Sequence, residues 1–304
     1  MSTSMSGGSV IDAIDAASPQ RCPALASTTA ELAQRRQRVG SDQLLIAIVG
    51  GSHAGCACAC SLIAAGVDPR SLAVFERSAE GRGGGAGVVA DDLSIAFLKG
   101  LGVLDESSEH GPYHRSRING MRVQEERVGT SGHRLKRDDH FPAFSAYWAD
   151  VHAMLRSSLP AGVVRYGMQL TGIAQQQSPP AAAEASSPPP VQLSFADGTR
   201  VTCELLIAAD GPTSTIRSSY SPPRGSLAPA GWAGPMRFAG YFAWRGVISR
   251  SQCPPSVLAA LLAEYPDFGN CLYFITTNRS TAGSRRPPRQ HAVLYELGGE
   301  LIKS

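Results

Sequence analysis

A glycine-rich turn between an apolar run and a run of small residues constrains this chain more than any other feature. Residues 44–49 are continuously apolar, and the next six residues, from Gly50 to Gly55, read G-G-S-H-A-G. A short run that is apolar throughout is typical of a strand buried on both faces of a parallel sheet. A glycine turn after such a strand predicts a helix that begins at the turn and packs closely on the strand. The sequence therefore predicts the first strand and helix of a βαβ unit.

The small residues of this turn have separate predicted tasks. Gly50 permits the tight turn, and Gly55 lets the helix approach the strand. The position between them, where a third glycine is usual, holds Ser52. Its side chain is small enough to leave room for a pyrophosphate and can donate a hydrogen bond to it. We expect Gly51 and Ala54 to line the same turn, so all five residues are candidate cofactor contacts.

A second apolar run, residues 72–75, ends in an acidic residue, Glu76. The helix between the two runs is predicted to end at Gly66, because glycine is common just after a helix C-terminus. Glu76 follows the turn by about 20 residues, where a carboxylate in dinucleotide-binding units accepts hydrogen bonds from a ribose. Strand, turn, helix, strand and acid follow in order, which predicts a dinucleotide site. An ordinary βαβ turn is the alternative.

The cysteines and histidines do not form a pattern that predicts a metal site. Cys56, Cys58 and Cys60 alternate with alanine in the predicted helix. Helix residues two positions apart point to different sides, so the three sulfur atoms cannot converge on one ion, and we interpret them as small apolar residues. His53 is expected to face the surface without a role, since a charged imidazole is disfavoured at a helix N-terminus. The other histidines are expected to be structural.

Composition limits the function classes further. The 304 residues carry a net charge of +3, which does not indicate a nucleic acid or an anionic membrane as partner. No apolar run approaches the roughly 18 residues of a spanning helix. Seven cysteines without a secretory signal favour reduced thiols and a cytoplasmic location. Residues 1–43, rich in Ser, Ala, Thr and Gly, are predicted to form a disordered extension, with organelle targeting as the alternative.

A proline-rich segment, residues 175–190, interrupts the second half of the predicted sheet. Its composition predicts a flexible surface insertion. The segments around it are predicted to form one helix, 149–159, and a meander of strands that crosses over the sheet, at 162–166, 169–173, 191–195 and 200–204.

A further apolar run, residues 205–209, is predicted to be a buried strand that ends in Asp210 and Gly211, with Ser214 and Arg217 spaced behind them. A strand ending in Asp-Gly lets the backbone pass close to a ligand. The alternative is an exposed strand-to-helix turn in which the aspartate is the N-cap.

Taken together, these motifs resemble the class A FAD-dependent monooxygenases, the aromatic hydroxylases. The resemblance rests on the glycine turn with Glu76 and Arg77, on the glycine-rich segment 81–87, and above all on the D-G-x-x-S-x-x-R pattern at 210–217. It covers roughly residues 44–304. The G-G-S turn, Trp148 and residues 241–246 most resemble the branch that includes 2,6-dihydroxypyridine 3-monooxygenase, and residues 241–248 alternate as a strand of its substrate sheet.

The resemblance implies an α/β fold in which a Rossmann-like FAD-binding domain carries an inserted mixed β-sheet substrate domain. Residues 44–115 and 145–222 would form the FAD-binding domain, and residues 116–144 and 223–304 the substrate domain. Carried onto this chain, further cofactor contacts of the family fall on Arg77, Arg82, Asp210 and Gly211, with Arg217 holding its segment or an incoming phosphate.

The implied cofactor is FAD, with NADH or NADPH as co-substrate. In this family O2 adds to the reduced flavin, and the resulting hydroperoxide hydroxylates a small aromatic or heteroaromatic ring. No catalytic side chain is assigned, because the protein need only position the ring, exclude water and neutralise developing charge. A homodimer is left open.

One departure from the family pattern concerns its third motif, a G-D segment followed by proline and glycines. Nothing after Arg217 matches it, so the resemblance implies a fold that is incomplete at the C-terminus. Two alternatives to an aromatic hydroxylase therefore remain. One is another FAD-dependent oxidoreductase of the same fold, and the other is a truncated, non-catalytic FAD- or nucleotide-binding remnant.

Overall fold

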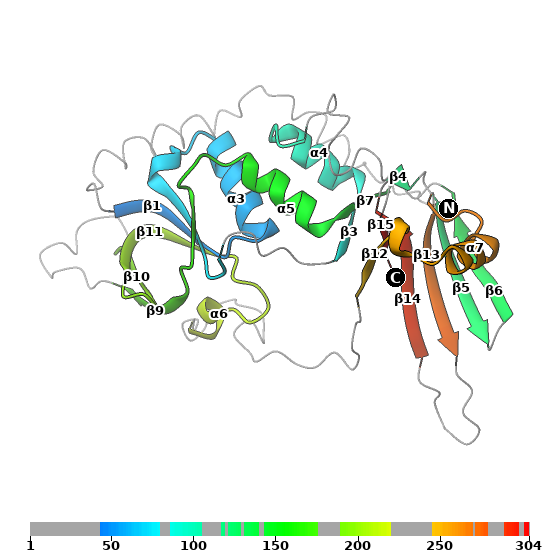
Figure 1. Ribbon diagram of the computed structural model, residues 1–304. Helices are drawn as coiled ribbons and strands as arrows, with labels where there is room; N and C mark the ends of the chain where they lie inside the picture. Colours follow the sequence, from blue (N-terminus) through cyan, green and yellow to red (C-terminus); the bar gives the residue numbers. More distant parts are fainter. Residues whose placement is uncertain are drawn as a thin grey trace, which may run out of the picture.

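The computed structural model describes residues 43–79, 86–104, 117–118, 121–128, 131–139, 143–175, 189–219, 245–269, 271–278, 289–297 and 301–303. Their strands form two six-stranded sheets and one three-stranded sheet (Figure 1). Several sequence predictions fall outside the described residues, among them the extension up to residue 42, the centre of the insertion at 175–190, and the contact at Arg82.

The first sheet contains the predicted βαβ unit. Its strand order is β8 (Val164–Tyr166), β2 (Leu72–Glu76), β1 (Gln43–Val49), β11 (Arg200–Ala208), β10 (Val191–Phe195) and β9 (Leu170–Gln175). The first four strands run parallel, whereas β10 and β9 pair antiparallel. Helix α3 (His53–Ala64) and the short η1 (Pro69–Ser71) connect β1 to β2. Gly66 follows α3 with φ +95°, as the predicted helix end requires.

Strand β11 differs from its prediction. The sequence predicted two strands, 200–204 and 205–209, in a meander that crosses over the sheet. The structure has one continuous strand within the same sheet. Its N-terminal half pairs antiparallel with β10, while residues 202–208 pair parallel with β1 on the opposite edge. The two pairings use different edges of the strand, so the chain needs no break between them.

Strand β1 is buried on both faces, as its continuous apolar run predicts. Ile46 and Ile48 belong to one hydrophobic cluster, and Ala47 and Val49 belong to another on the opposite face. Burying a side chain of this size contributes about 1.5–3 kcal/mol, so this strand anchors the layers on both of its faces. Phe75 also belongs to the second cluster, and its ring centroid lies 4.7 Å from that of a phenylalanine of β10.

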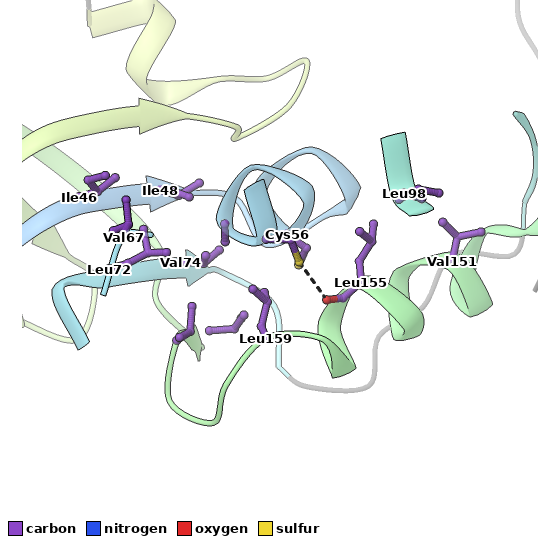
Figure 2. Close-up of a cluster of buried hydrophobic side chains, with 14 of the residues drawn as sticks. Ile46, Ile48, Cys56, Val67, Leu72, Val74, Leu98, Val151, Leu155 and Leu159 are labelled. Atoms are coloured by element: carbon purple, nitrogen blue, oxygen red, sulfur yellow. Dashed lines mark hydrogen bonds between the residues drawn. The ribbon is translucent and has the colours of Figure 1, made fainter. Parts of the chain in front are cut away.

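The first cluster lies under the helices α3, α4 (Asp92–Gly100) and α5 (Trp148–Ser157), which cover the same face of the sheet (Figure 1). Figure 2 shows Leu155 of α5 directed toward α3. The Cys60 thiol donates a hydrogen bond across 3.6 Å to the Leu155 carbonyl oxygen. This contact and the buried Cys56 agree with the prediction that cysteines of α3 act as small packing residues.

The second sheet is mixed, as the resemblance implied. Its order is β12 (Val247–Ser249), β15 (Leu301–Lys303), β14 (Arg289–Glu296), β13 (Cys271–Asn278), β5 (Met121–Val128) and β6 (Ser131–Asp138). β5 and β13 run parallel, and the remaining pairs are antiparallel. The segments η3 (Arg250–Gln252) and α7 (Pro255–Glu264) follow β12, and the turn after α7 places Tyr265 edge-on against Tyr273.

A third, antiparallel sheet has the order β3 (Gly87–Ala90), β7 (Ala143–Tyr147) and β4 (Arg117–Ile118). The strand predicted at 241–248 is shorter than expected. Arg245 and Gly246 lie outside any strand, β12 begins at Val247, and residues 241–244 are not among those described. Among the described residues, no helix combines the length and the apolar character needed to cross a membrane.

Candidate functional site

Three segments predicted from sequence meet at one edge of the first sheet. β1, β2 and β11 are parallel, so their carboxyl ends share that edge. The Gly50 N–H donates to the Phe75 carbonyl oxygen at 2.8 Å, and the Ala209 N–H donates to the Val49 carbonyl oxygen at 2.8 Å. The glycine turn is thereby joined to the end of β2 on one side and to the segment before Asp210 on the other.

The packing at this edge requires glycine at two positions. Gly50 has φ +107°, and a Cβ placed there would lie 2.1 Å from the Ala209 carbonyl oxygen. A Cβ on Gly55 would lie 1.8 Å from the Gly50 carbonyl oxygen. Real Cβ atoms do not approach backbone so closely, so any side chain at either position would force the turn, α3 and the end of β11 apart.

Glu76 is held by the backbone of the turn that it faces. Its carboxylate accepts one hydrogen bond from the Gly51 N–H and one from the Ser78 N–H, each at 2.8 Å. Burial acts to raise the pKa of this carboxyl, but the hydrogen bonds from Ser78 and Gly51 outweigh it, and the pKa is lowered. Glu76 is therefore an ionised acceptor. Each of its oxygens can accept a second hydrogen bond, as from a ribose hydroxyl.

The N-terminus of α3 opens beside this carboxylate. The first hydrogen bond within the helix runs from the Cys56 N–H to the Ser52 carbonyl oxygen at 2.9 Å, so the N–H groups of residues 53–55 have no acceptor inside the helix. The N-cap Ser52 does not use its side chain for capping, and the first turn carries no acidic residue. Ser52 and Ala54 are exposed. These features suit an anionic group such as a pyrophosphate.

The Asp210 segment forms a compact turn with its own hydrogen bonds. Gly211 has φ +80°, and Asp210 accepts from the Ile216 N–H at 3.2 Å. Helix α6 (Thr215–Ser219) begins directly after Ser214, so Asp210 is not the N-cap residue that the alternative predicted. The Ser214 hydroxyl accepts from the Arg217 N–H at 2.9 Å, and the Arg217 guanidinium donates to the carbonyl oxygen of residue 212. Arg217 therefore holds its own segment, which is one of the two tasks that the resemblance implied for it.

Sequence reasoning missed an aromatic cluster beside the turn. The His53 and Trp148 rings are stacked with centroids 4.5 Å apart, and the Trp148 and His152 rings are stacked at 5.0 Å. The expectation that His53 faces the surface is wrong, because its ring is half-buried on the indole. Burial lowers the pKa of His53, opposed by the hydrogen bond to Trp148 and assisted by His152. No pattern in the sequence indicated that His53 and Trp148, which are 95 positions apart, lie side by side.

Two other residues lie beside Glu76 and the glycine turn. Arg77 is exposed at the end of β2. Burial raises the pKa of the Cys56 thiol to about 11, which keeps it protonated as a donor to the Gly51 carbonyl oxygen at 3.2 Å. Within the ranges described, no group of three or more His, Cys, Asp or Glu residues is arranged to hold a metal ion.

Comparison with known proteins gives the site a family context. The family described as FAD binding domain matches residues 43–236. The 3-amino-4-hydroxybenzoate 2-monooxygenase of Streptomyces cremeus is 31% identical over 214 residues, which are 69% of this chain and 47% of that protein. The 2,6-dihydroxypyridine 3-monooxygenase of Paenarthrobacter nicotinovorans is 27% identical over 215 residues, covering 70% of this chain and 45% of that protein.

Among solved structures, 2,6-dihydroxypyridine-3-hydroxylase from Arthrobacter nicotinovorans matches with a TM-score of 0.58 at 21% identity, over 87% of this chain and 55% of that chain. The chain thus spans about half the length of the relatives it matches. The similarity of fold confirms the predicted α/β class with a mixed sheet. The family match confirms the predicted resemblance to FAD-dependent aromatic hydroxylases.

Proposed function

The chain belongs to the FAD-binding domain family, and from this premise we propose that it binds FAD at the carboxyl edge of the first sheet for NAD(P)H-dependent hydroxylation of an aromatic ring. One observation carries the proposal. The glycine turn and the Asp210 segment, far apart in sequence, are in contact through Gly50 and Ala209. A single dinucleotide can therefore reach both motifs.

In this proposal each part of the edge contacts a different part of the cofactor. The exposed Ser52 and the N–H groups of the first turn of α3, including that of Ala54, hold the pyrophosphate. Ionised Glu76 accepts from the ribose hydroxyls of the adenosine half. The absence of side chains at Gly50, Gly51 and Gly55 lets the turn pack on Ala209, on Glu76 and on α3, which sets the backbone of the turn for the cofactor.

Four further residues complete the proposed contacts. Asp210 and Gly211 lie at the carboxyl end of β11 and would face the ribityl side of FAD. Arg77, exposed beside Glu76, adds positive charge near the adenosine half. Arg82, outside the described residues, is proposed as a pyrophosphate contact on the resemblance alone.

Bound FAD would supply the electron transfer and the oxygen activation of the reaction. The chain's own part is to bind and orient: its turn fixes the cofactor, and the second sheet is proposed to cover the aromatic substrate. We assign residues 44–115 and 145–222 to cofactor binding and 116–144 and 223–304 to the substrate side. The relatives are named for hydroxylation of an aminohydroxybenzoate and a dihydroxypyridine, so an electron-rich ring is the proposed substrate class. A cytoplasmic location is proposed with it.

The test measures the oxidation of NADH or NADPH together with the labelled oxygen in the aromatic product. The purified chain is reconstituted with FAD, and NADH and NADPH oxidation is followed with and without phenols and hydroxypyridines under isotopically labelled O2. We expect faster oxidation with one ring class and one labelled oxygen atom in its product. Unstimulated oxidation without labelled product would favour another oxidoreductase of this fold. FAD binding without any oxidation would favour a non-catalytic remnant, and both results contradict the proposal.

A further inference from the structure

Gly51 is held by side chains on both sides of its Cα atom. Its N–H donates to Glu76 at 2.8 Å. Its carbonyl oxygen lies 2.7 Å from His152 Nε2 and 3.2 Å from the Cys56 sulfur. A carbonyl oxygen only accepts hydrogen bonds, so His152 Nε2 must carry the proton that it donates. Three side chains from β2, α3 and α5 thus hold the two peptide groups that flank one residue of the glycine turn.

A second hydrogen bond ties α5 to the start of α3. His53, the first residue of α3, lies with Nε2 2.9 Å from the carbonyl oxygen of Trp148, the first residue of α5. The three rings of this cluster are nearly parallel, with interplanar angles between 18° and 28°. The start of α3 and the glycine turn before it are therefore joined to α5 by stacking and by two hydrogen bonds donated from imidazoles.

We propose that His152 is a positioning residue of the cofactor site. Its Nε2–H fixes the Gly51–Ser52 peptide group and so holds Gly51 in the backbone conformation in which its N–H, part of the preceding peptide group, meets Glu76. Glu76 is thereby presented to the ribose of the dinucleotide. The His53–Trp148 pair keeps α5 close enough for this contact. This inference rests on the proposed FAD site. It adds a residue that neither the glycine motif nor the Asp-Gly motif contains.

The physical basis is the backbone conformation of Gly51, because its N–H and its carbonyl oxygen belong to two peptide groups that meet at the same Cα atom. If Gly51 changes φ or ψ, its N–H moves away from Glu76, and a half-buried carboxylate is left with one backbone hydrogen bond from Ser78. Cys56 also holds the Gly51 oxygen, but a thiol is a weak donor. The imidazole is the stronger of the two restraints on the carbonyl side. Its loss should therefore appear as weaker cofactor binding even where the fold is kept.

Two substitutions separate hydrogen bonding from ring packing. His152→Phe keeps a ring beside Trp148 and removes the donor, whereas His152→Gln removes the ring and keeps an N–H donor. His133→Phe, at an exposed position of β6, is the matched control. The FAD dissociation constant is measured by quenching of flavin fluorescence, and apoprotein melting reports folding. We expect about a tenfold weaker affinity for His152→Phe, an affinity within about threefold of wild type for His152→Gln, and no change for the control.

A His152→Phe affinity equal to wild type, or no weaker than that of His152→Gln, would overturn the inference, since packing would then matter more than the donor. Nitrogen-15 histidine spectra of the wild type give a second test that needs no variant. They should show the proton on His152 Nε2, and a proton on Nδ1 alone would contradict the inference. Absence of FAD binding in the wild type would overturn the proposed function and this inference together, whereas wild-type binding with an unaffected His152→Phe overturns the inference alone.

Discussion

At the scale of single residues, the space between Gly51 and Glu76 admits no additional carbon atom. A Cβ added to Gly51 would lie 2.8 Å from the Glu76 Cβ and 3.3 Å from Glu76 Oε2. We expect Gly51→Ala to displace the carboxylate and to weaken FAD binding at least about tenfold, the equivalent of one lost hydrogen bond to a charged group. Gly172→Ala is the control, because its Cβ would meet Ser194 Cβ at an ordinary 3.7 Å. Equal FAD affinities of the two variants in a fluorescence titration would contradict this expectation.

Glu76 also predicts a pH dependence of stability. Its pKa is lowered from 4.5 in the folded state, so its stabilising contribution is present above 4.5 and is lost as the pH falls through the folded pKa. Glu76→Gln removes this contribution. We expect the difference in free energy of unfolding between wild type and Glu76→Gln to be largest near neutral pH and to shrink in acid. Urea titrations across pH measure it, with exposed Glu264→Gln as control. A pH-independent difference would speak against the ionised, hydrogen-bonded carboxylate.

The protonation of His53 should change the stability of the fold in a different pH range. Its pKa is lowered from 6.5, mainly by burial, so the folded state favours the neutral ring. Its contribution is complete above 6.5 and is lost as the pH falls through the folded pKa. We expect wild type to lose stability below pH 6.5 more steeply than His53→Gln, in thermal melts of the apoprotein. Exposed His133→Gln should keep the wild-type slope. The same steepness in wild type and His53→Gln would mean that burial at His53 does not govern its protonation.

At the scale of elements, the approach of α3 to β1 depends on Gly55. A Cβ there would lie 1.8 Å from backbone of the turn, whereas a Cβ on Gly100, the last residue of α4, would meet nothing within 4 Å. We expect Gly55→Ala to destabilise the fold by about 1–3 kcal/mol, as overpacking does, and Gly100→Ala to be neutral or stabilising by up to about 1 kcal/mol. Chemical denaturation measures both. A Gly55→Ala variant as stable as Gly100→Ala would show that α3 can move away without cost.

The elements that sequence predicted well are those with a local signal. The apolar run of β1, the glycines of the turn and the acid after β2 lie within one βαβ unit, so spacing alone indicated their arrangement. β11 was divided in error because one strand serves an antiparallel and a parallel partner on its two edges, and periodicity does not report pairing. The His53–Trp148–His152 cluster could not be predicted, since it depends on how α5 packs on α3 and not on any spacing in the chain.

At the scale of the whole molecule, the carboxyl edge of the first sheet is connected to the two other sheets (Figure 1). β7 runs directly into α5, so the strand of the third sheet ends where Trp148 meets His53. The Ser145 hydroxyl of β7 donates to the Glu296 carbonyl oxygen at the end of β14, which joins the third sheet to the second. The second sheet therefore contacts, through Ser145, the same strand that leads into the rings beside the glycine turn.

The central claim is that the carboxyl edge of the first sheet binds FAD through its pyrophosphate and its adenosine half. Calorimetric titration of the purified chain with FAD, and separately with FMN, tests it most directly, because FMN carries the flavin but lacks the adenosine half. We predict one FAD per chain and at least about a hundredfold weaker binding of FMN, equivalent to two tenfold steps of affinity. Equal affinities for FAD and FMN, or no heat of binding with FAD in a folded sample, would contradict the claim.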